Sequence, residues 1–417
     1  EDKMKTMPSL LAPAGNMRAL QTALRFGADA VYCGAKQYGL RAQANNFDEK
    51  QLEEAVRLAH AAGAQVNLTL NIFAFDGDLD GMVRTAQRAR DVGVDAAIVS
   101  DLGAIARIAR EVPGLDVHVS TQASVSNSEA AKVWHSLGAK RIVCARELSV
   151  ADISRMRAEI PDDLELEAFV HGSMCMAYSG RCLISDYLTG RSALTGNCTQ
   201  SCRWNYTLEE EKRPGEHYPI EEDAHGTYLM NAQDLNMLSH LDELREAGVD
   251  SVKIEGRNKK AFYVATVVNA YRQVLDGADP SLFQTELETV SHRPYSTGFY
   301  FGPAHQAYQT DAREQSREWA AEVLEVEECA GGYRAEVLCR NSFTKDSELE
   351  VLSPRREVRA VELAAIEHLP FAKDGAVLEG YEVERANRAM EHYALTTPVE
   401  LEPHDILRMR KLPAARA

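Results

Sequence analysis

Several features are missing from this chain of 417 residues, and each absence narrows what it can be. No apolar run approaches the roughly 18 residues that cross a bilayer, so we expect no membrane association. No apolar stretch typical of a secretion signal follows the first residues, which favours the cytoplasm. The GxGxxG, HExxH and GxSxG motifs are also missing, which argues against a dinucleotide-binding sheet and two common kinds of hydrolase.

Basic residues are also fewer than acidic residues. Lys and Arg number 46 against 63 Asp and Glu, which gives a formal net charge of −17. Nonspecific binding to a polyanion needs a broad basic surface, so the composition argues against that class of protein. Local basic groups remain, one within residues 181–213 and one at Arg257, Lys259 and Lys260.

A loose repeat runs through the first two thirds of the chain, in which an amphipathic helix ends at Gly and a short apolar run follows. Glycine suits the residue after a helix, and the apolar run is typical of a strand buried on both faces. Alternating strands and helices predict an α/β fold, a (β/α)8 TIM-like barrel, with a doubly wound open sheet as the alternative. The eight expected strands lie at 10–15, 26–34, 62–71, 92–101, 115–122, 137–147, 164–172 and 247–257.

Changes in pattern predict the domain boundaries. Short strands separated by Gly and Asp turns after the barrel indicate a small all-β barrel or sandwich. We expect a disordered or expression-derived N-terminus at 1–7, the barrel at 8–290 with a cysteine-rich insertion at 172–225 after its seventh strand, a linker at 291–317, the β domain at 318–405 and a basic tail at 406–417.

Four of the eight cysteines gather in the insertion, at Cys175, Cys182, Cys198 and Cys202. The gaps of six, fifteen and three residues are loose for zinc, whose ligands usually come in close pairs. We therefore expect a [4Fe–4S] cluster on these thiolates, with zinc and redox or structural thiols as alternatives. The segment follows the seventh strand, so it lies at the barrel mouth, where chemistry is carried out. The remaining cysteines are scattered, and Cys33 and Cys144, in apolar strands, are expected to be buried and inert.

The seventh strand carries two candidates for proton handling. Strict alternation places Glu165, Glu167, Phe169 and His171 on one face. If that face is the barrel lumen, Glu167 and His171 can exchange protons with a bound substrate. The alternative is a buried Glu–His pair that only braces the barrel.

Charged residues at the other strand ends form a second group. Guanidinium groups grip carboxylates through paired hydrogen bonds, so we expect Arg146 and Arg257, with Lys253, to bind a small dicarboxylate. The alternative is ion pairing within the rim, for instance between Arg146 and Glu255. The remaining candidates are Glu255 as a further catalytic residue and Gln122, Arg41 and Asn45 as further substrate contacts.

The run EAFVHGSMCMAYSGRCLIS at residues 167–185 resembles the defining motif of peptidase family U32, a collagenase-like family of unknown catalytic type. Blocks such as LLAPAGNMRAL, CTQSCRWNY and VKIEGRNKKAFYVA extend the resemblance over most of the chain. The segment 206–218 is shorter than the family pattern leads us to expect, which affects how RNA would dock.

The resemblance implies oxygen-independent hydroxylation rather than proteolysis. Members similar in length to this chain imply prephenate-dependent conversion of the wobble uridine in the tRNA anticodon loop to 5-hydroxyuridine, with a [4Fe–4S] cluster on Cys175, Cys182, Cys198 and Cys202 and an electron donor that the residues do not identify. The alternatives are a peptidase, a hydroxylase of ribosomal RNA, and a noncatalytic scaffold for tRNA or the cluster. Trp204, Tyr206 and Tyr178 are candidates for base stacking or, alternatively, for packing around the cluster.

Overall fold

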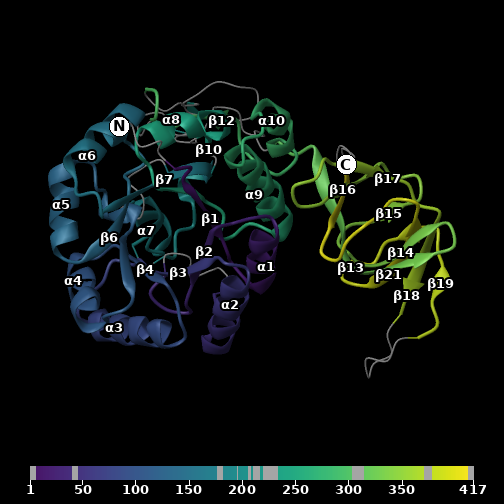
Figure 1. Ribbon diagram of the computed structural model, residues 1–417, viewed down its shortest axis with the longest axis horizontal. Coiled ribbons are helices and arrows are strands. Elements are labelled where there is room, and N and C mark those ends of the chain that lie inside the picture. Colours follow the sequence, from purple (N-terminus) through teal and green to yellow (C-terminus); the bar gives the residue numbers. More distant parts are fainter. Residues whose placement is uncertain are drawn as a thin grey trace.

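Two parts lie side by side in the computed structural model, a barrel wrapped by helices and a smaller β domain (Figure 1). Among the residues that the structure describes, no helix is both long and apolar enough to cross a bilayer. The described residues are 6–39, 46–175, 182–194, 196–204, 208–209, 217–218, 233–302, 314–370 and 378–411.

The barrel is a closed parallel sheet. Its strands follow chain order around the barrel, and β11 pairs with both β1 and β7, which closes the ring. Each strand overlaps one of the eight predicted runs, so the TIM-like barrel is confirmed and the open sheet is not. The strands are β1 (Ser9–Pro13), β2 (Ala30–Gly34), β3 (Gln65–Leu70), β4 (Ala96–Val99), β5 (Asp116–Val119), β6 (Ala139–Val143), β7 (Glu165–Ser173) and β11 (Ser251–Ile254).

Helices cover the outside of the barrel (Figure 1). Side chains of Asn16, Asp101 and Asn127 accept hydrogen bonds from first-turn backbone amides of α1, α4 and α5, which fixes where these helices begin. Gly27 and Gly93, with φ of 96° and 90°, follow the ends of α1 and α3 in the left-handed conformation that the repeat predicts. The helices are α1 (Met17–Arg25), α2 (Glu49–Ala61), α3 (Asp76–Asp91), α4 (Leu102–Glu111), α5 (Ser128–Ser136), α6 (Val150–Glu159), α8 (Leu241–Glu246), α9 (Ala261–Leu275) and α10 (Ser281–Leu287), with short 3-10 turns at Thr121–Ala123 and Leu238–His240.

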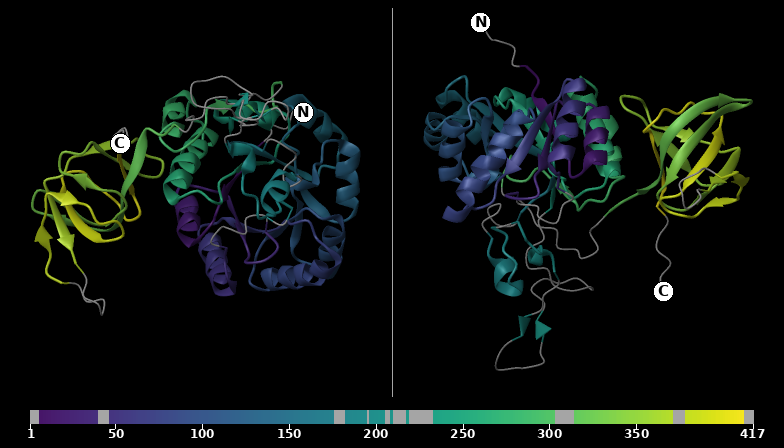
Figure 2. Two further views of the ribbon diagram at one scale, coloured as in Figure 1. Left: turned by 180° about the vertical axis from the view of Figure 1, so that it is seen from behind. Right: turned by 90° about the horizontal axis from the view of Figure 1, so that it is seen from below.

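The cysteine-rich insertion lies between β7 and β11. It contains α7 (Ile184–Thr189), a 3-10 turn (Ser201–Arg203), the paired strands β8 (Leu208–Glu209) and β9 (His217–Tyr218), and β10 (Asp234–Asn236). The right-hand view of Figure 2 shows the insertion projecting beyond one end of the barrel. Strand β10 pairs antiparallel with the end of β7, and β12 (Tyr295–Ser296) pairs with β10. Residues near 295 therefore belong to the barrel sheet, and the predicted linker starting at 291 is placed too early.

The C-terminal domain is an antiparallel β structure with its own apolar core. Strand β22 (Ile406–Arg410) pairs with β13 and β16, and Leu407 and Met409 join the core. The prediction that a basic tail begins at residue 406 is therefore wrong, because alternate residues of this run are apolar and fill the sheet. The other strands are β13 (Arg317–Cys329), β14 (Gly332–Cys339), β15 (Phe343–Thr344), β16 (Leu349–Leu352), β17 (Arg359–Val361), β18 (Ala365–Leu369), β19 (Tyr381–Glu382), β20 (Arg385–Ala386) and β21 (His392–Thr397).

A buried arginine joins the two parts. Arg408 on β22 is 2% exposed and donates two hydrogen bonds to the Glu286 carboxylate on α10, at 2.7 and 2.9 Å. Its Nε donates to Glu350 Oε2 on β16 at 2.8 Å. Arg25 of α1 also reaches Asp405, with 2.9 Å between Nη2 and Oδ1. Ion pairs across the boundary therefore hold the β domain against the barrel.

Replacing Arg408 by alanine is expected to lower the free energy of unfolding by about 3 kcal/mol, because two partly buried carboxylates lose their shared cation. The control is Arg317→Ala, since Arg317 bonds the same Glu350 at 2.7 Å but is more exposed. The control is expected to cost at most about 1 kcal/mol. Urea unfolding of the full chain measures the free energy of unfolding of both variants. Equal decreases would show that the buried contacts of Arg408 stabilise the protein no more than the more exposed pair of Arg317.

Candidate active site

A cavity of about 680 Å³ opens at the end of the barrel where the parallel strands finish. Three walls surround it, formed by the strand ends and their loops, the segment after β11, and the cysteine-rich insertion. The conserved geometry of parallel barrels brings the ends of all strands to one face, so residues distant in sequence meet here. Of the predicted site residues, the structure brings Gln122, Arg146, Cys175, Cys182, Cys198, Cys202, Lys253, Glu255 and Arg257 to this one cavity.

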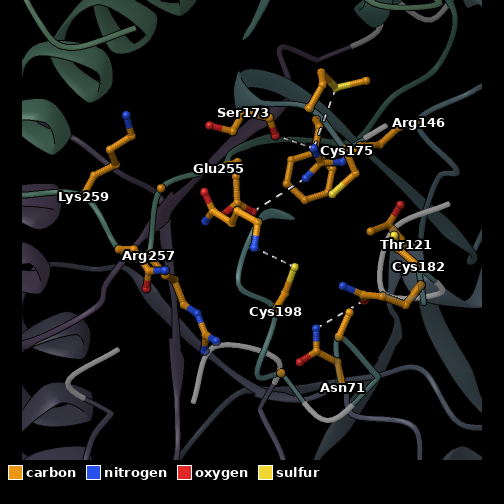
Figure 3. Close-up of a pocket in the computed structure, with 18 of the residues that line it drawn as sticks. Asn71, Thr121, Arg146, Ser173, Cys175, Cys182, Cys198, Glu255, Arg257 and Lys259 are labelled. Atoms are coloured by element: carbon orange, nitrogen blue, oxygen red, sulfur yellow. Dashed lines mark hydrogen bonds and ion pairs between the residues drawn. The ribbon is translucent and has the colours of Figure 1, made fainter. Parts of the chain in front are cut away.

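The four insertion cysteines all line the cavity, and none of them is in a disulfide. Cys175 and Cys198 are exposed, while Cys182 and Cys202 are half-buried. Figure 3 shows the labelled cysteines Cys175, Cys182 and Cys198 around the cavity. Among the described residues, no three Cys, His, Asp or Glu side chains are close enough together to hold a metal ion. Four cysteine thiols are the usual ligands of an iron–sulfur cluster, and all four line this one cavity.

Two arginines supply positive charge to the same cavity. The Arg146 guanidinium lies 3.8 Å from the centre of the Phe169 ring, donates to Ser173 O at 2.8 Å and lies 3.6 Å from Glu255 Oε2. Arg257 is 4% exposed, and its Nη1 donates to Thr69 Oγ1 at 2.6 Å. Arg146 therefore both faces the cavity and forms the rim ion pair with Glu255 that was the alternative expectation.

Below the cavity, the barrel lumen holds a group of buried charges. The Glu167 carboxylate is fully buried and accepts from Lys253 Nζ and from Arg141 Nη1, each at 3.0 Å. Burial by itself would raise the pKa of Glu167, but the charges of Lys253 and Arg141 outweigh it and lower that pKa to about 2. His118 lies in the same lumen, and burial lowers its pKa to about 3, so it is neutral. Glu167 is ionised and is not among the residues that line the cavity, whereas its partner Lys253 does line it.

His171 does not share the lumen face with Glu167, so the alternation prediction is wrong at this residue. The register of β7 against β11 shifts between Lys253 and Ile254, so that Phe169 lies opposite Lys253 while His171 lies opposite Ile254. This bulge reverses the alternation. The fully buried His171 ring packs among tyrosines of α9 and β12 instead, and burial lowers its pKa to about 3.

Two predicted substrate contacts, Arg41 and Asn45, lie outside the described residues, as do Tyr178 and Tyr206. Trp204 lines the cavity and is 44% exposed. Cys33 and Cys144 are buried, as predicted, and burial raises the pKa of each thiol to about 12, which disfavours the reactive thiolate.

Sequence reasoning missed a cluster contributed from beyond the barrel strands. Asp234, His292 and Arg293 all line the cavity, and the Arg293 guanidinium lies 3.6 Å from Asp234 Oδ1. They reach the mouth because β10 and β12 extend the barrel sheet there. The only available signal was the turn-rich aromatic run around residue 295, which gives no hint of this pairing.

Comparison with known proteins identifies the family. The model of peptidase family U32 matches residues 15–310, and the model of the family's C-terminal domain matches residues 315–408. The chain belongs to peptidase family U32. These two matches coincide with the barrel and the β domain, so both parts of the U32 chain are family features.

Several curated proteins are similar to this U32 chain over most of its length. Escherichia coli K12 tRNA hydroxylation protein P is 33% identical, over 89% of this chain and 90% of that protein. Bacillus subtilis 168 tRNA hydroxylation protein P1 is 38% identical, over 84% of both chains. The 23S rRNA 5-hydroxycytidine C2501 synthase of Escherichia coli K12 is 38% identical over 64% of this chain, but only 39% of that longer protein is covered.

Proposed function

We propose that this U32 protein is an RNA-modifying enzyme that hydroxylates the wobble uridine of tRNA to 5-hydroxyuridine without molecular oxygen. In this proposal it uses an iron–sulfur cluster and prephenate. The names of the relatives, which describe tRNA and ribosomal RNA hydroxylation, support the RNA substrate. The observation that carries the proposal is the shared cavity, where four cysteine thiols and a cationic wall meet at the mouth of the barrel.

Cys175, Cys182, Cys198 and Cys202 would hold the cluster. When bound, a [4Fe–4S] cluster supplies one-electron chemistry at the cavity wall. The loops that carry these thiols belong to the insertion, which is anchored at its start by β7 and at its end by β10.

The barrel side of the cavity suits a small dicarboxylate such as prephenate. Arg146 and Arg257 offer two guanidinium groups, one for each carboxylate, and Figure 3 shows them on different sides of the cavity. Lys253 adds a primary amine at the floor. Tyr32, Ile98, Val143 and Phe169 provide apolar surface between these cations for the carbon ring of the substrate.

Substituting Gly34 by alanine is expected to weaken prephenate binding about tenfold, the cost of one impaired charge-assisted hydrogen bond. A Cβ at this position would lie 2.2 Å from Arg257 Nη1 and 2.7 Å from Asn46 Oδ1, so the guanidinium must move. Gly77→Ala is the control, because its Cβ would meet open space. Isothermal titration with prephenate compares the variants, and equal affinities would remove Arg257 from the proposed site.

A base flipped out of a single-stranded anticodon loop can enter an open barrel mouth. Arg191 and Trp204 are exposed on the insertion at the edge of the cavity, where a phosphate and a base would approach. Because the net charge is −17, the rest of the surface repels RNA, so binding should be specific and sensitive to salt. The cytoplasm, where tRNA is found, and a separate electron donor both belong to this proposal.

The proposal is tested by nucleoside mass spectrometry of tRNA from cells that lack the gene, grown without oxygen. We expect 5-hydroxyuridine and its derivatives to disappear and to return with the wild-type gene but not with Cys175→Ala. An unchanged tRNA profile would contradict the proposed substrate, and ribosomal RNA would then be examined. Full rescue by Cys175→Ala would contradict the role of the cysteines.

A further inference from the structure

The floor of the cavity holds a lysine with chemistry beyond its charge. Lys253 stands on the barrel strand β11, is 4% exposed and lines the cavity. Its Nζ lies 4.5 Å from the centre of the Tyr32 ring and 5.4 Å from the centre of the Phe169 ring. The amine is therefore held in a nearly dry aromatic setting at the base of the site.

Burial at the floor of the cavity favours a neutral amine at this position. Glu167 accepts from both Lys253 and Arg141, at 3.0 Å each, and one carboxylate cannot neutralise two cations. Arginine keeps its proton in proteins, whereas a buried lysine gives its proton up more readily. Burial lowers the pKa of Lys253, and the charge of Glu167 opposes that effect only in part. Of the three buried side chains Glu167, Arg141 and Lys253, Lys253 is therefore the one that can become a nucleophile.

We propose that Lys253 forms an imine with the carbonyl group of a 2-oxo acid bound in this cavity. The neutral Nζ attacks the carbonyl carbon and a C–N bond forms, while the carbonyl oxygen leaves as water with the two amine hydrogens. No electrons are transferred in this step. The carboxylate next to the carbonyl pairs with Arg146 or Arg257, which line the same cavity. Prephenate contains such a 2-oxo acid group, so the inference rests on the proposed function and adds a covalent anchor to it.

A covalent role and a purely electrostatic role differ in what they require. An electrostatic anchor needs only a positive charge, so arginine could replace it. An imine needs a primary amine that faces the cavity. The cavity offers one internal comparison, Lys259, whose Nζ donates to Ser291 O at 3.0 Å and lies 4.7 Å from the centre of the Tyr263 ring.

Reductive trapping tests the inference. The full-length protein is incubated briefly with pyruvate, the simplest 2-oxo acid, or with prephenate, then treated with cyanoborohydride and mapped by peptide mass spectrometry. We expect a reduced adduct on Lys253 in the wild type and in Lys259→Met. In Lys253→Arg the adduct should fall to the level of a sample without 2-oxo acid.

The wild-type map decides the matter even if Lys253→Arg fails to fold. Absence of an adduct on Lys253, or labelling no greater than on Lys259 and surface lysines, would overturn the inference. The assay contains no tRNA, so its outcome is separate from that of the proposed function. Protein that hydroxylates tRNA but gives no adduct would refute the imine alone, whereas an adduct in protein that modifies no RNA would refute the proposed function alone.

Discussion

Replacing Glu167 by glutamine is expected to lower the free energy of unfolding by about 3–5 kcal/mol, because it removes the buried carboxylate that bonds both Lys253 and Arg141. Lys253 and Arg141 both contact Glu167 at 3.0 Å within the barrel lumen. Glutamine keeps nearly the same volume, so the loss reports charge rather than packing. Urea unfolding at neutral pH measures it.

Glu165→Gln is the matched control. Glu165 pairs with the same Arg141, at 2.6 Å, but its side chain is 47% exposed. Water screens that pair, so its loss should cost at most about 1 kcal/mol. Equal stability of the two variants would show that the buried contacts of Glu167 with Lys253 and Arg141 do not stabilise the barrel more than the exposed pair does.

The same contact predicts how stability depends on pH. The pKa of Glu167 in the folded protein, about 2, lies below its usual value of about 4.3. A carboxylate with a lowered pKa stabilises the fold above its unfolded-state pKa, and that contribution is lost as the pH falls towards the folded-state value. The difference in stability between wild type and Glu167→Gln should therefore be largest above about pH 4.3 and shrink as the pH falls towards about 2.

Replacing Cys198 by alanine is expected to reduce iron and sulfide content to background and to abolish tRNA hydroxylation. A closed four-thiolate site cannot hold its cluster securely on three ligands. Protein purified without oxygen is examined by metal analysis and visible absorbance, and hydroxylation is read from tRNA nucleosides. Cys198 is exposed at the cavity, so this variant should fold normally.

Cys329→Ala serves as the control for thiol loss. Cys329 is a free, half-buried thiol at the end of β13 in the β domain. The Cys329→Ala variant should keep its full iron content and its full tRNA hydroxylation activity. Iron retained by Cys198→Ala at the wild-type level would show that this thiol is not a ligand, and zinc in place of iron would refute the cluster.

Much of the barrel could be predicted from sequence because its signals are local. Glycine after a helix and an apolar run after that glycine placed five of the eight barrel strands, for example β2 and β4, and apolar runs alone placed the other three. The position of the cysteines after β7 followed from strand order alone. Since parallel strands end on one face, the sequence also predicted that Arg146, Lys253 and Arg257 would meet.

The errors come from structure that is not local. His171 does not lie on the predicted face because the register shifts between β7 and β11. Such a shift depends on both strands, so the sequence of β7 alone does not reveal it. His292 and Arg293 reach the cavity through the pairing of β10 with β12, which joins segments about sixty residues apart. The predicted domain boundary at residue 405 left β22 in a basic tail, whereas Arg408 is buried against Glu286 and Glu350.

The central claim is that one cavity joins a thiolate-bound cluster to a carboxylate site for RNA hydroxylation. Its most direct test uses purified, cluster-loaded protein with unmodified tRNA in the absence of oxygen, and measures 5-hydroxyuridine with and without prephenate. The account predicts product only when prephenate is present and the four cysteines are intact. Product formed without prephenate, or no product from protein with a full cluster, prephenate and a supply of electrons, would contradict it.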